Sequence, residues 1–135
     1  MVRAVIDAVD RAQCFRWALN NRAPTMVWSS AHATLLGDAV HATLPYMAQG
    51  AAMAIEDAAV LARALELPGP LPARLARYER HRAPRTARMV RESTEMGELY
   101  HIGDAASMRC AFEERDIARS RNEWLYPYEP WSAAL

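Results

Sequence analysis

The chain has 135 residues, is 52% hydrophobic and carries no net formal charge. That length suits one modest domain or a piece of one, and a zero net charge gives no overall attraction to nucleic acid or to an anionic membrane. The two cysteines lack a CxxC spacing and fit neither a disulfide framework nor a zinc site. Without an apolar stretch of membrane-spanning length or a signal-peptide core, we expect a soluble protein of the cytoplasm with no membrane partner.

The amino-terminal part is expected to hold one short helix and two short strands. Apolar residues at helical spacing predict a helix over residues 2–12. The stretch CFRWAL at 14–19 and the apolar residues at 33–37 are typical of strands, because turn-forming residues bound them. We expect the second strand to close at Gly37 and Asp38 and to be followed by a loop over 40–49.

A helix is predicted from about Gly50 to Glu66, with a side of small and apolar residues that would accept a very close neighbour. The residues on this side are Ala51, Ala54, Ile55, Ala58, Leu61, Ala62 and Leu65. The proline- and glycine-rich segment 67–72 must interrupt the helix, since proline lacks the amide donor. We place the boundary between two regions there, so that they cover residues 1–69 and 70–135.

The second region is expected to be helical throughout, apart from its tail. One helix is predicted from residue 73 to about 100, with Pro84 as its kink, and another over 104–121. The aromatic and proline-rich tail that follows should be irregular. The whole chain is therefore predicted to be mostly α-helical with a few short strands.

Charge is divided unevenly between the pieces of this second region. Residues 74–91 carry seven arginines against Glu79 alone, whereas residues 92–135 carry four arginines against nine acids. The basic helix and the acidic tail could therefore pair with each other.

An alternative interpretation of the whole chain is a nucleic-acid-binding or protein-interaction module built on the arginine-rich helix. We expect no nucleic-acid partner, because charge on a helix face is usually only solvated. The arginines on one broad face are Arg74, Arg77, Arg85, Arg88 and Arg91.

A possible ligand site lies at the junction of the second strand and the helix from Gly50. A strand that ends in Gly-Asp would place the Asp38 carboxylate at a sheet edge, where it can accept hydrogen bonds from two hydroxyl groups. The helix start offers free amides and the positive end of the helix dipole, with no bulky side chain before them. An acid for hydroxyls and an amide nest for an anionic edge suit a long ligand such as a flavin. Alternatively, Asp38 only caps a turn and the alanines only pack helices.

The stretch GDAVHATLPYMAQGAAMAIEDAAVLARAL, residues 37–65, resembles the second flavin-binding motif of FAD-dependent aromatic monooxygenases. The resemblance is greatest to the salicylate hydroxylase and 3-hydroxybenzoate 6-hydroxylase branch. The flanking stretches FRWALNNRAPTMVW and YERHRAPRTARMV are also similar to that branch. It implies the carboxyl-terminal portion of an α/β FAD-binding monooxygenase fold, with FAD as cofactor, NAD(P)H as reductant and hydroxylation of a small aromatic substrate.

The resemblance also implies roles for individual residues. Asp38 would bind the ribityl chain, Pro45 would lie beside the isoalloxazine ring, and Gly50 with Ala51 would offer amides to its pyrimidine edge. His41 would orient the loop or be a satisfied structural histidine. Glu56 and Asp57 are interpreted as salt bridges or caps for neighbouring segments. No residue is assigned as catalytic or metal-binding. The cofactor-binding set is Gly37, Asp38, His41, Pro45, Gln49, Gly50, Ala51 and Ala52.

One feature of the family is missing from these residues. The sequence contains no GxGxxG stretch after a strand, the fingerprint that holds the ADP half of FAD in the family. We therefore expect a truncated fragment that is inactive alone. Its uncovered apolar surface would favour self-association.

Overall fold

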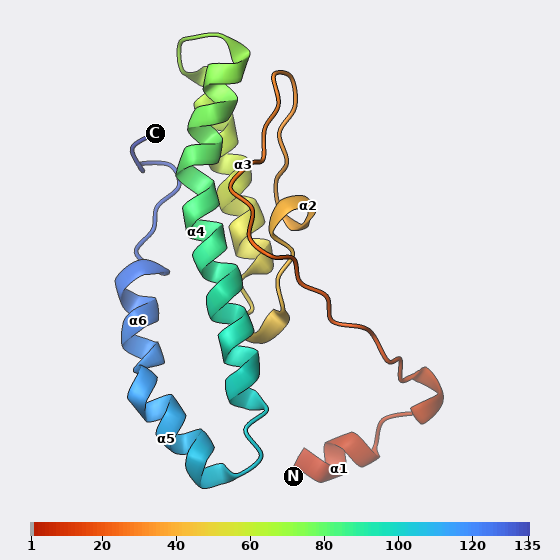
Figure 1. The fold of residues 1–135 in the computed structure, drawn as a ribbon. Helices are drawn as coiled ribbons and strands as arrows, with labels where there is room; N and C mark the ends of the chain where they lie inside the picture. Colours follow the sequence, from red (N-terminus) through yellow and green to blue (C-terminus); the bar gives the residue numbers. More distant parts are fainter. Residues whose placement is uncertain (1) are drawn as a thin grey trace.

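The computed structural model describes residues 2–135, apart from the side chains of residues 117, 118 and 122. Two long helices, α3 (Gly50–Glu66) and α4 (Leu71–Tyr100), pack along each other as a hairpin (Figure 1). Two shorter helices, α5 (Ala105–Arg115) and α6 (Ile117–Trp124), return along α4. The prediction of a mostly helical chain is confirmed.

Proline and glycine set the ends of these helices much as predicted. Helix α3 has the predicted bounds, and the linker after it is short because α4 begins at Leu71, two residues earlier than expected. Pro72 fits there, since amides in the first turn have no intrahelical acceptor. Pro84 lies inside α4 without ending it. Asp116, with φ 40°, divides the helix predicted over 104–121 into α5 and α6.

The two predicted strands are wrong for this chain. Residues 14–19 have no regular structure, and the only pairing near 33–37 is an isolated antiparallel bridge between Ser29 and Thr34. A strand is stable only beside a continuous partner; within the described residues, 14–19 has none and 33–37 has only this single bridge. Phe15 and Trp17 are accordingly 77% and 79% exposed.

The segment after Gly37 is more ordered than the predicted loop. Asp38 begins a single helical turn, α2 (Asp38–His41), instead of closing a strand, and a 3-10 turn, η2 (Pro45–Met47), follows. The predicted helix over 2–12 is also shorter than expected, since α1 (Val2–Asp7) ends early and a 3-10 turn, η1 (Arg11–Gln13), follows it. Helix α1 and the turn η1 lie away from the helical body (Figure 1).

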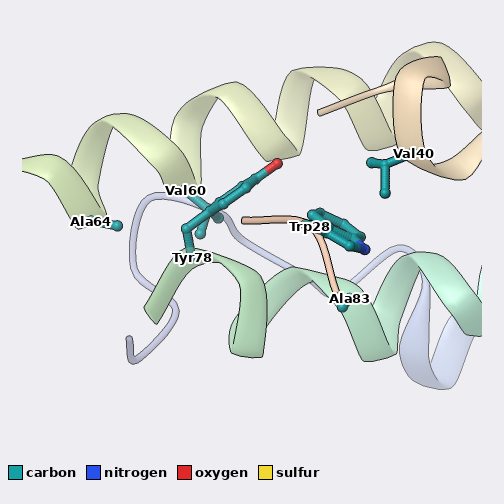
Figure 2. Close-up of a cluster of buried hydrophobic side chains, with 6 residues drawn as sticks. All are labelled: Trp28, Val40, Val60, Ala64, Tyr78 and Ala83. Atoms are coloured by element: carbon teal, nitrogen blue, oxygen red, sulfur yellow. The ribbon is translucent and has the colours of Figure 1, made fainter. Parts of the chain in front are cut away.

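Two hydrophobic clusters hold the body together. The tryptophan cluster lies between α3 and α4, where Figure 2 shows the rings of Trp28 and Tyr78 side by side. The methionine cluster joins η2, α3 and α4 to the start of the tail; flexible methionines fill such irregular gaps well. The tryptophan cluster is Trp28, Val40, Val60, Ala64, Tyr78 and Ala83. The methionine cluster is Met47, Met53, Met89, Met96, Leu99 and Leu125.

Helix α3 buries a different side from the one that its small residues predicted. Met53, Asp57, Val60 and Ala64 are buried, and they belong to the opposite, mixed side. On the predicted side, most residues are exposed, including Ile55 at 70%. The side that should accept a close neighbour therefore lies open in the described chain.

Arginines of α4 pair mainly with groups other than acids of the tail. Arg85 makes two hydrogen bonds to Glu56 of α3, at 2.7 and 2.8 Å, and others to the Trp124 and Leu125 carbonyls. Arg88 bonds to Glu92 in its own helix. The guanidinium carbon of Arg85 also lies 4.0 Å from the centre of the Tyr128 ring. Of the pairing predicted between the basic helix and the acidic residues 92–135, the Arg88–Glu92 pair is present. Arg82 and Arg85 instead pair with Asp57 and Glu56 of α3, and the tail contributes aromatic and carbonyl contacts.

Among the helices that the structure describes, none has both the length and the apolarity needed to span a bilayer.

Candidate functional site

A hollow of about 630 Å³ opens where the segment around α2 and η2 meets the amino end of α3. Its wall consists mainly of glycine, alanine and other apolar residues, with one carboxylate at the rim. Small residues leave the backbone accessible, so a long flat ligand can approach it closely. The lining residues are Leu36, Gly37, Asp38, Thr43, Leu44, Pro45, Ala48, Gly50, Ala51 and Ala54.

Gly37 is required by both its backbone and its surroundings. Its φ of 61° and ψ of −145° are strained for residues with a side chain, and an added Cβ would lie 3.3 Å from the Cβ of Ala54. The residue caps the start of α2 and so brings the exposed Asp38 to the rim of the hollow. Any other residue here would have to move either α2 or α3.

The opposite wall is the amino end of α3. Ala48 is in the left-handed region, with φ 54°, and turns the chain from η2 toward the helix. Gln49 occupies the cap position but makes no side-chain hydrogen bond to the first turn. Amides of a first helical turn have no acceptor within the helix, and here Gly50, Ala51 and Ala52 supply them without a bulky side chain. This end can therefore receive hydrogen-bond acceptors or partial negative charge.

The loop between the two walls is held by α4. Ser93 donates a hydrogen bond of 2.6 Å to the carbonyl of Leu44. Gly97 lets the Tyr46 ring pack against α4, since a Cβ on Gly97 would lie only 2.5 Å from that ring. These contacts fix Leu44 and Pro45 at the edge of the hollow.

Directly behind the hollow lies a fully buried carboxylate, Asp57 of α3. Its Oδ2 accepts hydrogen bonds from the Gly37 amide at 3.0 Å and from His41 Nε2 at 2.6 Å, and its Oδ1 accepts one from Arg82 Nε at 2.7 Å. Burial would raise the pKa of Asp57, but the hydrogen bonds from His41, Gly37 and Arg82 hold that pKa below its usual value. Because an ionised carboxylate only accepts, Nε2 of His41 carries a proton.

A second acid, Glu56, extends this network on the side of α4. Its Oε2 lies 2.8 Å from Arg82 Nη1 as an ion pair without a hydrogen bond, and both its oxygens bond to Arg85. Burial works to lower the pKa of Arg82, but Asp57 and then Glu56 raise it overall, so the guanidinium stays charged. The interpretation of Glu56 and Asp57 as salt-bridge residues is confirmed.

The structure brings five of the eight predicted cofactor-binding residues around the hollow: Gly37, Asp38, Pro45, Gly50 and Ala51. His41 instead lies behind it as a buried structural partner of Asp57. Gln49 and Ala52 are half-buried beside it and do not line it. For all eight residues, contact with FAD stays a prediction.

Sequence reasoning missed Arg82 and several wall residues. Arg82 continues the buried side of α4 formed by Leu75, Tyr78 and Met89, and an arginine within such an apolar stripe indicates a buried acid elsewhere in the chain. The missed wall residues adjoin the predicted ones, so contiguity was their only signal. They are Leu36, Thr43, Leu44, Ala48 and Ala54.

Comparison with known proteins identifies the family. A family model described as FAD binding domain matches residues 8–93. The 3-hydroxybenzoate 6-hydroxylase of Polaromonas naphthalenivorans (strain CJ2) is 49% identical over 120 residues, which cover 82% of this chain and 29% of the relative. The 3-amino-4-hydroxybenzoate 2-monooxygenase of Streptomyces platensis is 38% identical over 134 residues, which cover 95% of this chain and 33% of the relative.

Solved structures agree with this match. HpxO of Klebsiella pneumoniae complexed with FAD and uric acid has a TM-score of 0.73 and 28% identity, over 84% of this chain and 29% of that one. A variant of HpxO complexed with FAD has a TM-score of 0.75 and 27% identity, over 90% and 34% of the two chains. In these four comparisons the chain thus spans between 29% and 34% of the length of the protein that it matches. It belongs to the FAD-binding-domain family of the FAD-dependent monooxygenases.

Proposed function

We propose that residues 37–54 form the flavin end of an FAD site in an NAD(P)H-dependent hydroxylase of small aromatic compounds. The observation that supports this proposal is the hollow itself, which joins one exposed carboxylate to a helix start without a side-chain cap across a wall of small residues. Its volume of about 630 Å³ lies within the range of small-molecule sites.

The residues present fit the flavin end of FAD. The Asp38 carboxylate can accept hydrogen bonds from the ribityl hydroxyls, and Gly37 lets the chain approach without a Cβ. First-turn amides at Gly50 and Ala51 suit the electron-rich pyrimidine edge of the ring. Pro45 and Leu44 offer apolar contact to a flat ring.

When bound, FAD would supply the redox chemistry, taking electrons from a nicotinamide and using molecular oxygen to hydroxylate the ring of the substrate. The chain's own residues bind and orient the cofactor. The amino end of α3 favours negative charge on the pyrimidine edge, and the apolar wall excludes water from it.

The substrate class is proposed from the relatives. Two of them are named for 3-hydroxybenzoate and 3-amino-4-hydroxybenzoate, both hydroxylated benzoates. We infer an aromatic acid that carries a ring hydroxyl, because electron donation by that group activates the ring toward oxygen transfer. No residue of the hollow is assigned to it.

Splitting the cofactor tests the proposal on this chain. FMN contains the isoalloxazine and ribityl groups, whereas ADP represents the other half of FAD. In an NMR titration, FMN should shift the amides of residues 37–54 weakly but specifically, and ADP should leave them unchanged. FAD should bind no more tightly than FMN, because no GxGxxG stretch occurs in these 135 residues to hold the ADP half.

Asp38→Ala should weaken FMN binding by about 1–3 kcal/mol, the value of a hydrogen bond to a charged group. Asp7→Ala, in the distant helix α1, is the matched control and should change nothing. The proposal fails if FMN leaves residues 37–54 unshifted at millimolar concentration, or if ADP shifts the same amides.

A further inference from the structure

Both ends of α2 are attached to one carboxylate oxygen. The Gly37 amide at its start and the His41 ring at its end bond to Asp57 Oδ2, at 3.0 and 2.6 Å. A single helical turn has no stability of its own, because nucleation costs more than one turn of hydrogen bonds returns. The turn is held from outside itself: Asp57 fixes both of its ends, Val40 packs into the tryptophan cluster, and Arg22 donates to the Ala39 carbonyl at 2.8 Å.

Asp57 is itself immobilised from α4. Arg82 Nε donates to its other oxygen at 2.7 Å, and Arg82 Nη2 donates to the Met53 carbonyl at 3.3 Å. Arg82 and Asp57 are both fully buried, where an ion survives only with close partners. Trp28 covers the other side of His41, with ring centres 5.8 Å apart. One continuous chain of contacts thus runs from α4 through α3 to α2.

Both walls of the hollow are therefore attached to the same helix, α3. The first-turn amides at Gly50 and Ala51 belong to α3, and Asp38 is tied to α3 through Asp57. A ligand that contacts both walls needs a constant spacing between them, because small misplacements of binding groups lose much of their effect.

We propose that Asp57 and Arg82 are positioning residues that set the place of Asp38 relative to the amino end of α3. This inference rests on the proposed function of the hollow as the flavin end of an FAD site. Neither residue lines the hollow, so they act through α2 and not by contact with the ligand.

Glu56 provides a matched control. It belongs to the same helix and also pairs with Arg82, yet its recorded hydrogen bonds and ion pairs lead to Arg82 and Arg85 and none leads to α2. Glu56→Gln therefore removes a charge from the network without touching the attachment of α2.

The first experiment measures amide hydrogen exchange in the chain without any flavin. The amides of Val40 and His41 bond to the Gly37 carbonyl at 3.0 Å and report directly on α2. Asp57→Asn also leaves Arg82 with Glu56 as its remaining recorded acid, so the helical body loses stability as well. It should therefore speed exchange of these two amides about tenfold beyond any change at amides in the middle of α4, since local opening of α2 becomes easier. Glu56→Gln should leave it unchanged. Equal exchange of these amides in the wild type and Asp57→Asn would overturn the proposal.

Should Asp57→Asn fail to fold, as judged by circular dichroism, His41→Phe, which keeps a ring beside Trp28 but has no donor, gives the decision. This variant cuts one attachment of α2 and keeps the Arg82 pair. It should speed exchange of the Val40 amide several-fold, and unchanged exchange would overturn the proposal.

The second experiment measures FMN binding by the same variants. Asp57→Asn should raise the Kd about fivefold or more, and Glu56→Gln should not, because only the former releases Asp38. A positioning effect on α2 without any FMN binding by the wild type would reject the proposed function and keep the structural role. FMN binding with no difference between the two variants would reject the positioning role and keep the proposed function.

Discussion

The two sides of α3 are similar in apolar content but opposite in surroundings. The inner side, with Met53, Asp57 and Val60, is buried against α4 and both hydrophobic clusters. The outer side, with Ile55 and a row of alanines, is open and adjoins the hollow. The comparison separates two tasks, since the inner side carries the stability of the helical body and the outer side presents the candidate site.

The difference also shows where a charge can be placed. The inner side holds ionised Asp57 at zero exposure because three donors converge on it. The outer side carries no charge between Ala51 and Leu65, although water could reach it. Burial thus follows from the neighbours that the fold supplies and not from the polarity of the side chain alone.

The largest effect is expected from breaking the inner ion pair. Arg82→Met should lower the free energy of unfolding by about 3–5 kcal/mol, because Asp57 would remain buried without its counter-ion. Urea unfolding followed by circular dichroism measures this loss. Arg119→Met, which breaks the exposed pair with Glu123, is the control and should cost less than about 1 kcal/mol. Equal losses in the two variants would contradict the comparison.

The second-largest loss of unfolding free energy is expected from truncating an apolar residue of α3, and it should depend on the side of the helix. Met53→Ala should cost about 2–5 kcal/mol, since Met53 is 1% exposed and leaves a cavity in the methionine cluster. Ile55→Ala should stay within about 0.5 kcal/mol, because Ile55 is 70% exposed. The same unfolding measurement serves both. A large cost for Ile55→Ala would mean that the outer side is covered in solution.

A smaller effect concerns self-association through the outer side. The wild-type chain should form concentration-dependent oligomers, because Ile55 and its alanine neighbours leave an apolar surface open to water. Ile55→Glu should shift the chain toward monomer in sedimentation velocity, with an unchanged circular dichroism spectrum. Asp7→Glu serves as the control. Monomeric wild type at all concentrations would contradict the expectation.

The smallest effect is a pH dependence of stability at His81, which lies on α4 and is hydrogen-bonded to Tyr128 of the tail. Burial, followed by the charges of Arg82, Arg63 and Arg85, lowers the pKa of His81 from its usual 6.5. The unfolded chain therefore binds more protons at this residue, so its contribution is present above pH 6.5 and is lost as the pH falls toward the lower pKa of the folded chain. His81→Gln should reduce the loss of stability between about pH 7.5 and about pH 5.5. An unchanged slope would exclude this role for His81.

Predictions from the sequence were most accurate where the cause is local. The bounds of α3 and the interruption after it follow from apolar spacing, a glycine and nearby prolines. The grouping of Gly37, Asp38 and Gly50 around one hollow was predicted from the resemblance, and the structure brings them together. The strands at 14–19 and 33–37 were wrong, because strand formation depends on a partner that no local pattern specifies.

The sequence by itself determined the long helices, the glycine positions and the family, since helical spacing, turn chemistry and a contiguous motif are written in neighbouring residues. Only the tertiary structure decided which side of α3 is buried and which arginine is paired. The apolar stripe of α4 indicates that Arg82 has a buried acid partner, but that partner, Asp57, lies 25 residues away and no local pattern identifies it. Burial depends on the summed contacts of distant segments, so an ion pair across two helices becomes visible only when those helices are packed.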